Sequence, residues 1–224
     1  MSDGARLAVD IGGTFTDVVL EHGGGQDSVK LLTTPDAPDR AVLEGVGDIL
    51  RRTGVSASDV TLVIHGTTLA TNALIERKGA LTALVTTDGF RDSIEIAYEH
   101  RFEQYDLYME RPLPLVARDW RFSVPERIAA DGSVLLDLDE GVLRALAGDL
   151  DKAGVEAVAI CFLHSYMNPD HEQRAGAILA EALPNVAVTL SAEVCPEIRE
   201  YDRMSTACAN AYVQPMMAGY LKRL

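Results

Sequence analysis

The 224-residue chain is 47% hydrophobic and carries a formal net charge of −14, from 34 acidic and 20 basic side chains. A chain of this size and composition can bury a sizeable core and is typical of a globular protein. The acidic balance and the lack of a basic cluster argue against a nucleic-acid partner. The three cysteines have no C-x-x-C spacing, which argues against a disulfide framework or a zinc knuckle.

Residues 7–20, LAVDIGGTFTDVVL, predict a β-hairpin, because apolar residues alternate before and after a Gly-Gly turn. Gly12 and Gly13 are suited to the turn since they tolerate positive φ. The period of two places the apolar residues of the first strand on one face and Asp10 on the other. We therefore expect the apolar face to enter a core.

Asp10 ends the first strand beside two residues that lack a Cβ, and the hydroxyls of Thr14 and Thr16 follow. A carboxylate, bare backbone N–H groups and hydroxyls together suit a Mg²⁺-bound polyphosphate. A plain Gly-Gly hairpin with a solvated Asp10 is the alternative, since short glycine motifs occur widely.

The elements that follow predict an α/β arrangement. Residues 28–32 form a third strand of a small antiparallel meander, and Asp36 caps a helix with Pro38 in its first turn that ends before Gly54. Residues 60–64 are a short apolar run suited to a buried parallel strand.

A second strand-turn-helix junction begins at His65, and its helix closes at residues 77–79. Because ligands collect beyond the carboxyl ends of strands and helix N-termini favour anions, Thr67, Thr68 and Asn72 are candidates for lining a nucleotide or substrate cleft. The alternative makes Thr67 or Thr68 a simple N-cap. We interpret His65 as a hydrogen-bonded core histidine, since nothing nearby completes a metal or nucleophile constellation.

Residues 81–86 predict another strand, and residues 100–120 show no clean period, which predicts a long ordered loop. Long loops are often functional, so Arg91, Arg101 and Arg111 are possible substrate contacts. A single arginine in such a loop is more often a surface or ion-pair residue.

The rest of the chain predicts an α/β repeat. In order, the pattern indicates a hairpin over 120–128 and 133–136, a helix capped by Asp139, a buried central strand over 155–163, a helix opened by Asn168-Pro169, and a strand over 186–190. His164 and His171 flank one junction, but their spacing fits no helical pair of metal ligands.

Asp202 then caps a last helix that Pro215 kinks or ends. Its apolar stripe consists of Met204, Ala207, Cys208, Ala211 and Tyr212. The chain shows no basic segment followed by an apolar leader and no apolar run long enough to span a bilayer, so we expect a cytoplasmic protein without a membrane partner.

Four strings together identify a family resemblance. Residues 10–17, DIGGTFTD, resemble the first phosphate loop of the actin/hexokinase/Hsp70 ATPase superfamily. Residues 65–73 (HGTTLATNA), 86–92 (TTDGFRD) and 125–128 (PERI) are similar to successive signatures of the hydantoinase A/5-oxoprolinase family. That family also includes the acetone carboxylase β-type subunits. The resemblance covers almost the whole chain.

The resemblance implies an α/β, ribonuclease H-like (actin-like ATPase) N-terminal lobe with a mixed sheet and a second α/β segment. It implies an N-terminal domain over residues 1–200, with residues 201–224 as the first helix of a following domain. Members use ATP and Mg²⁺ to phosphorylate an amide or carbonyl oxygen, so we expect an ATP-dependent hydrolase of cyclic amides. Implied partners are the nucleotide, a cyclic amide or ketone, and further domains or a subunit in an oligomer.

The resemblance also implies site roles. Asp10 is the catalytic residue and holds Mg²⁺ or its waters, and Asp17 fixes the hairpin or holds a metal-bound water. The remaining assignments are phosphate contacts for the backbone of Gly12 and Gly13, supporting hydroxyls for Thr14 and Thr16, and substrate-side contacts for Thr67, Thr68 and Asn72. Since the second phosphate loop of the superfamily has no copy here, we expect the chain alone to bind nucleotide weakly and to turn over little or nothing.

Three other interpretations stay open. The chain is similar enough to acetone carboxylase β-type subunits that a carboxylase role fits the same motifs. A non-catalytic binding or assembly module is the second, in which an exposed apolar stripe of the last helix docks a partner. A sugar-kinase-like protein is the third, and residues 65–73 fit it poorly.

Overall fold

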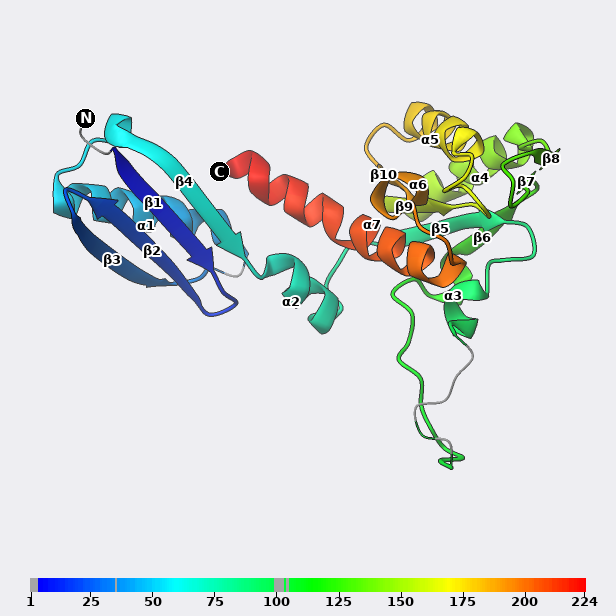
Figure 1. Ribbon diagram of the computed structural model, residues 1–224, viewed down its shortest axis with the longest axis horizontal. Coiled ribbons are helices and arrows are strands. Elements are labelled where there is room, and N and C mark those ends of the chain that lie inside the picture. The colour runs from blue at the N-terminus through cyan, green and yellow to red at the C-terminus, as the bar shows by residue number, and fades with distance from the viewer. Residues whose placement is uncertain (1–3, 35, 99–102, 104) are drawn as a thin grey trace. The chain divides into compact units, whose positions relative to one another are not determined.

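The computed structural model describes residues 4–34, 36–98, 103 and 105–224, which divide into two compact units (Figure 1). Unit 1 comprises Met1–Glu76 together with Met216–Leu224, and unit 2 comprises Arg77–Pro215. These units are defined by contacts within the structure, whereas the boundary expected at residue 200 separates two domains of the family. The structure does not test that boundary, which stays a prediction.

Unit 1 is built on a four-stranded mixed sheet in the order β3-β2-β1-β4. The strands are β1 Ala5–Ile11, β2 Phe15–His22, β3 Gly25–Leu32 and β4 Val60–Thr67. The first three form an antiparallel meander, and β4 lies parallel to β1. The expected hairpin is confirmed: Leu7, Val9 and Ile11 are buried, and Asp10 is exposed.

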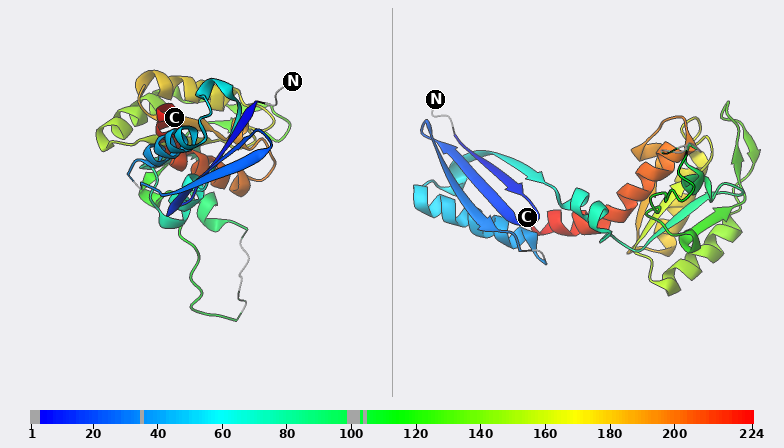
Figure 2. Two further views of the ribbon diagram at one scale, coloured as in Figure 1. Left: turned by 90° about the vertical axis from the view of Figure 1, so that its left-hand side faces the viewer. Right: turned by 90° about the horizontal axis from the view of Figure 1, so that it is seen from below.

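Helix α1, Pro38–Thr53, covers one face of this sheet (Figure 2). Its Val42 and Ile49 join the buried face of the hairpin in one core. The helix ends at Gly54 in the left-handed conformation, as the sequence predicts, but Asp36 is not its cap. Because the helix begins at Pro38, the N-cap position falls on Ala37, which makes no side-chain hydrogen bond to the helix. A short 3₁₀ turn, η1 Ala57–Asp59, and helix α2, Leu69–Glu76, complete the local elements.

The expectation of a buried strand at residues 60–64 is wrong. β4 is parallel, as predicted, but it is the edge strand and has β1 as its neighbour on one side only. Leu62, Val63 and Ile64 are therefore exposed, although they read as core residues in the sequence.

The last residues of helix α7, Glu200–Arg223, belong to unit 1 from Met216 onward. Tyr220 is buried in the core of unit 1, and its hydroxyl lies 2.7 Å from Nε2 of His65. Burial raises the pKa of Tyr220 to about 12, so the phenol is protonated and donates to the imidazole. Arg223 Nε donates to Asp39 of α1 over 2.8 Å. His65 is thus a hydrogen-bonded structural histidine, as interpreted.

Unit 2 is a three-layer α/β arrangement around a parallel sheet in the order β10-β9-β5-β6. Its strands are β5 Thr82–Thr87, β6 Arg121–Val124, β9 Ala157–Cys161 and β10 Ala187–Leu190. Helices α4, Glu140–Ala153, and α5, Asp170–Ala182, pack on one face, while α3, Ser93–Ile96, and the first part of α7 pack on the other. The predicted α/β repeat with a buried central strand is confirmed.

The helix caps of unit 2 are close to expectation. Asp139 caps α4 by accepting the N–H of Val142 over 3.0 Å. Helix α5 begins one residue later than predicted, since Pro169 is the N-cap itself, yet the Asn168 side chain still accepts the N–H of Asp170.

The expected hairpin over 120–128 and 133–136 is only partly right. The strand β6 joins the parallel sheet beside β5. A two-stranded antiparallel ribbon remains, made by β7 Arg127–Ile128 and β8 Val134–Leu136. Two short elements complete the unit, η2 Arg118–Trp120 and α6 Ser191–Val194.

Helix α7 begins at Glu200, so Asp202 is not its cap, and the helix continues through Pro215. Its predicted stripe packs inside unit 2, where Met204, Ala207 and Cys208 are buried. This burial contradicts the premise that the stripe is exposed for docking. In the part of the chain that the structure describes, no helix is long and apolar enough to cross a membrane. Cys161, Cys195 and Cys208 are free thiols, as expected.

Candidate functional site

Asp10 stands at the carboxyl end of β1, between two neighbouring strands. It pairs in register with Asp17 of β2 on one side and with Gly66 of β4 on the other. A Cβ built on Gly66 would lie 3.4 Å from Asp10 Oδ1, so glycine there leaves space around the carboxylate. Among the described residues, no group forms a hydrogen bond or ion pair with the side-chain carboxylate of Asp10. The carboxylate is thus exposed and available to a ligand.

The turn after Asp10 uses its glycines for a different reason than predicted. Neither Gly12 nor Gly13 has a positive φ. A Cβ on Gly12 would lie 3.2 Å from the Phe15 carbonyl oxygen, and one on Gly13 would lie 3.2 Å from Nδ2 of Asn72. Close approach, not backbone conformation, therefore favours glycine at both positions.

The amides of the turn are not all equivalent. Gly12 N–H donates to the Phe15 carbonyl over 2.9 Å, which closes the hairpin and occupies that donor. In the described ranges the N–H groups of Gly13 and Thr14 have no acceptor. Two adjacent free amides at a tight turn are donors of the kind that anion-binding loops use.

Thr16 braces this turn from inside. Its side chain is fully buried and shares a hydrogen bond of 2.9 Å with the hydroxyl of Thr33. The Thr33 hydroxyl in turn donates to the Gly12 carbonyl, and the Thr33 N–H donates to the Thr14 carbonyl. The structure therefore gives Thr16 a supporting place, whereas Thr14 is exposed. The sequence did not indicate Thr33 as a site residue, because its contacts with the turn depend on the register of the meander.

Asp17 is held by a cation that the sequence did not single out. Lys30 Nζ on β3 lies 2.9 and 2.8 Å from the two carboxylate oxygens of Asp17. Like charges directly across two strands are destabilising, so Lys30 offsets the repulsion between Asp10 and Asp17. Asp17 as a holder of metal-bound water stays a prediction.

The second junction closes onto the hairpin. Thr68 N–H donates to the Ile11 carbonyl over 3.1 Å, and Asn72 Nδ2 donates to the Thr68 hydroxyl over 3.2 Å. The Thr67 hydroxyl accepts the N–H of Leu69, which is the capping role given above as its alternative. Thr68 and Asn72 are thereby fixed beside Gly13, and unit 1 alone brings both junctions together.

This arrangement has the chemistry of a site for a metal-bound phosphate. Mg²⁺ takes one or two protein carboxylates, keeps several waters and completes its shell with phosphate oxygens. Asp10 is a free carboxylate of that kind, and the N–H groups of Gly13 and Thr14 are free donors of the kind that phosphate oxygens accept from. No group of three or more His, Cys, Asp or Glu side chains within the described ranges could hold a metal without such help.

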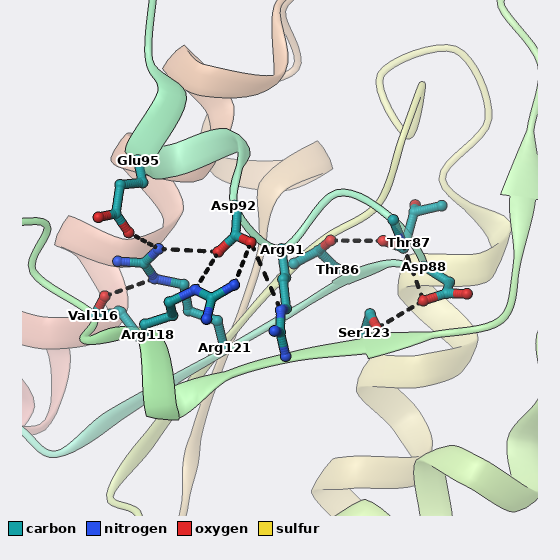
Figure 3. A network of polar contacts seen from close by, with 11 residues as sticks. Thr86, Thr87, Asp88, Arg91, Asp92, Glu95, Val116, Arg118, Arg121 and Ser123 are labelled. Atoms are coloured by element: carbon teal, nitrogen blue, oxygen red, sulfur yellow. Dashed lines mark hydrogen bonds and ion pairs between the residues drawn. The ribbon is translucent and has the colours of Figure 1, made fainter.

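The signature at residues 86–92 has a structural role in unit 2. Figure 3 shows Arg118 bound to Asp92 through two hydrogen bonds. Its Nε and Nη2 donate to the two carboxylate oxygens of Asp92 over 3.0 and 2.9 Å. This hydrogen bonding by Arg118 holds the pKa of Asp92 below its usual range. Buried Arg121 adds a 2.6 Å ion pair with Glu95 and a hydrogen bond to the Val116 carbonyl. The network ties α3 to the segment before β6.

The arginines named as substrate candidates fall into different places. Arg91 is half-exposed and lies 3.9 Å from Asp92 as an ion pair. Arg111 donates to the carbonyls of Glu95 and Ile96 and so covers the end of α3. Arg101 lies outside the described residues. A substrate contact by any of them stays a prediction.

A buried network fills the carboxyl edge of the parallel sheet. His171 Nδ1 donates to Glu126 over 2.8 Å, Thr87 donates to the other Glu126 oxygen, and Leu163 N–H donates to Thr87 over 2.8 Å. Strand order reverses between β5 and β9, where open α/β sheets bind ligands. Here the chain's own polar groups occupy that edge. His164, left with an unpaired buried Nδ1, joins no metal cluster among the described residues.

Comparison with known proteins places these observations in a family. The family model for the hydantoinase/oxoprolinase N-terminal region matches residues 6–183. The chain is 42% identical over 226 residues to caprolactamase subunit alpha of Pseudomonas jessenii, covering 98% of this chain and 32% of that protein. It is 34% identical over 228 residues to the acetophenone carboxylase gamma subunit of Aromatoleum aromaticum, covering 94% and 31%.

A crystal structure of the ATP-dependent caprolactamase from Pseudomonas jessenii superposes with a TM-score of 0.86 and 41% identity, over 97% of this chain and 33% of that one. The chain thus spans about a third of the length of these relatives. The likeness confirms the ATPase-like α/β fold with a mixed and a parallel sheet. The chain belongs to the hydantoinase/oxoprolinase family and carries its N-terminal region.

Proposed function

We propose that this chain is the ATP-handling N-terminal part of an ATP-dependent hydrolase that opens a cyclic amide. The observation that carries the proposal is the unpartnered Asp10 carboxylate beside the free amides of Gly13 and Thr14. The name of the caprolactamase relative supports the substrate class, a lactam. Because ATP is the cosubstrate, we expect this function in the cytoplasm.

In this proposal each residue of the site has a defined task. Asp10 holds Mg²⁺ or its waters, with Asp17 as a second, Lys30-paired carboxylate. The amides of Gly13 and Thr14 donate to phosphate oxygens, and Gly12 contributes room and turn closure. Thr16 stiffens the turn, while Thr67, Thr68 and Asn72 border the ligand. Bound Mg·ATP supplies the phosphoryl group that turns an amide oxygen into a leaving group.

The chain alone carries only part of such an enzyme. The relatives are about three times as long, and the described residues contain a single phosphate-loop hairpin. Charge neutralisation and positioning, which dominate phosphoryl transfer, are therefore incomplete here. We expect weak nucleotide binding and little turnover, and robust ATP-dependent amidase activity of the 224-residue chain would contradict this expectation.

A ketone carboxylase is the second candidate. It is favoured by the 34% identity to a subunit of acetophenone carboxylase. The same phosphate site would serve a ketone oxygen, so unit 1 does not separate the two reactions. Bicarbonate-dependent ATP hydrolysis in the complete assembly would select the carboxylase, and lactam-dependent hydrolysis would select the amidase.

The test is thermal melting of the chain with Mg·ATP, with ATP plus EDTA and without ligand. Asp10→Asn is compared with Asp59→Asn, a matched change of an exposed acid in unit 1. A ligand at 100 times its Kd adds about 2.7 kcal/mol to the folded state. We expect a Mg²⁺-dependent rise in Tm that Asp59→Asn keeps and Asp10→Asn loses.

The other outcomes are equally informative. A shift that survives Asp10→Asn would place the nucleotide elsewhere. No shift at millimolar nucleotide would mean that the site needs parts beyond this chain, or that the chain is a non-catalytic module.

A further inference from the structure

A segment of unit 2, residues 105–113, exposes large apolar side chains far beyond the level of an ordinary surface. Tyr105 and Tyr108 are each 91% exposed, Leu107 is 83% exposed and Leu113 is 80% exposed. Figure 1 shows this segment, the arm, extending away from the sheet and helices of unit 2. Contiguous exposed apolar groups of this kind mark interaction sites.

The arm is anchored at its base. Arg111 Nη1 donates to the carbonyls of Glu95 and Ile96, over 3.4 and 3.3 Å, at the end of α3. Arg77 Nη2 donates to the Leu113 carbonyl. Two guanidinium groups from different places in unit 2 therefore fix where the arm leaves the surface.

The tip of the arm has a hydrogen-bonded turn of its own. Asp106 Oδ1 accepts the N–H of Tyr108 over 2.8 Å, and Asp106 N–H approaches the Glu103 carbonyl at 3.4 Å. A side chain that bonds the backbone two residues on is typical of a local turn. The turn presents its tyrosines to solvent instead of folding them against unit 2.

The chemistry of the arm indicates what it binds. Tyrosines and a leucine supply anchor groups of the kind that dominate protein interfaces. Asp106 and Glu110 of the arm, with Glu103 just before it, outnumber Arg111, so this part of the chain carries a small net negative charge. The whole chain has a net charge of −14, so docking of this acidic arm on a second copy is opposed by repulsion. A complementary surface is apolar with a basic rim.

We propose that the arm docks into an apolar groove with a Lys/Arg rim on a separate partner subunit. Two relatives of this chain are themselves named as subunits, of caprolactamase and of acetophenone carboxylase. The arm belongs to the region that both align with, since they cover 98% and 94% of the chain. The proposal does not depend on the nucleotide site, which lies in unit 1.

The test places a photo-crosslinking amino acid at position 105 or 108, in extract of the source organism. Position 135 is the control, because Leu135 is another exposed apolar residue of unit 2 and lies outside the arm. Any polypeptide crosslinked from the arm is identified by mass spectrometry, purified and titrated against the chain. Binding is then compared for the double variant Tyr105→Ser/Tyr108→Ser and for Leu135→Ser.

We expect one other polypeptide to bind saturably and to bind more weakly as salt increases. The double tyrosine variant should weaken the complex at least about 100-fold without changing the Tm, and Leu135→Ser should leave both unchanged. Crosslinks to copies of this chain alone, equal crosslinking from position 135, or a complex that tolerates the double variant would each overturn the proposal. Asp10→Asn should still bind, which separates this test from that of the nucleotide site.

Discussion

The two sheets of the molecule treat charged side chains in opposite ways. In unit 1, β1 alternates between buried and exposed residues, and Asp10 reaches solvent without a partner. In unit 2, all five residues of β9 are buried, and the carboxylates at its end accept hydrogen bonds from the chain itself. A sheet with one open face leaves a carboxylate free for a ligand. In a sheet covered on both faces, the carboxylates instead accept hydrogen bonds that hold the surrounding elements together.

Glu172 is the centre of the architecture in unit 2. It accepts Phe162 N–H over 2.7 Å, the Ser191 hydroxyl over 2.6 Å and Ala192 N–H over 2.8 Å. Fully buried Arg203 lies next to this group, donating to the Ser165 hydroxyl and the Phe162 carbonyl. These bonds join β9, α5, α6 and α7 at one point.

The largest effect in the comparison should come from Glu172→Ala. The change leaves two buried donors and one partly buried donor without this acceptor, which we expect to cost about 3–5 kcal/mol of unfolding free energy. Urea unfolding followed by the fluorescence of Trp120, the single tryptophan, reports on unit 2. The control is Glu193→Ala, an exposed acid of α6, and equal midpoints for the two variants would contradict the central role of Glu172.

In unit 1 the corresponding change is Tyr220→Phe, which should lower the unfolding free energy by less than Glu172→Ala does in unit 2. It removes the one hydroxyl that donates to His65 Nε2, and we expect a loss of about 1–2 kcal/mol. Amide hydrogen exchange of β1 and β4 measures it. Tyr105→Phe removes a hydroxyl from an exposed tyrosine and should leave that exchange unchanged. If Tyr220→Phe behaves like Tyr105→Phe, the bond contributes nothing to unit 1.

Glu172 of unit 2 and Asp39 of unit 1 should respond to acid with opposite signs. Burial raises the folded-state pKa of Glu172, so its protonation favours the folded state below the unfolded value of about 4.3, and this gain is lost as pH rises through the folded pKa. Arg223 lowers the pKa of Asp39, so that contribution is present above about 3.9 and is lost as pH falls through the lower folded pKa.

Hydrogen exchange from pH 7 to pH 3 separates the two responses. Protection around Glu172 in unit 2 should hold or rise toward about pH 4.3, while protection around Asp39 in unit 1 should fall below about pH 3.9. The region around Asp92, whose pKa is also lowered, should respond like that of Asp39 although it belongs to unit 2. Arg223→Ala should remove the acid response of unit 1 and leave that of unit 2 in place. Parallel loss around Glu172 and around Asp39 would contradict the assignment.

The smallest effect is expected for the thiols. Modification of Cys195, which is partly accessible, should leave the stability of the protein unchanged. Burial raises the pKa of Cys161 to about 12 and that of Cys208 still higher, so both stay protonated at pH 8. We expect one fast thiol in a reaction with a disulfide reagent, and Cys195→Ser should abolish it; a second fast thiol would show that the core of unit 2 opens.

Local patterns in the sequence predicted the parts of the fold that depend on local physics. Alternation gave the hairpin and its buried face, and the Asp139 side chain marked the start of α4. The prediction was wrong where the position of a strand depends on neighbours that are distant in sequence. β4 is apolar but lies at the edge of its sheet, and β6 pairs with β5 instead of folding back on the next strand. No local signal distinguishes an edge strand from a central one.

The candidate site shows the same division. Asp10 was placed from the period of two alone, since its face follows from its neighbours in sequence. Lys30 and Thr33 were not foreseen, because their contacts depend on the register of the third strand. The reason for the glycines was also missed, as only the folded chain shows Asn72 lying against Gly13.

The place of Tyr220 in the core of unit 1 determines the order in which the two units can complete their cores during synthesis. Unit 2 is continuous, from Arg77 to Pro215, and has all its residues once that stretch has left the ribosome. The first unit begins earlier but has a gap in its core until the chain reaches residue 220. Domains fold as units during synthesis, so the segment made first is the one that finishes folding last.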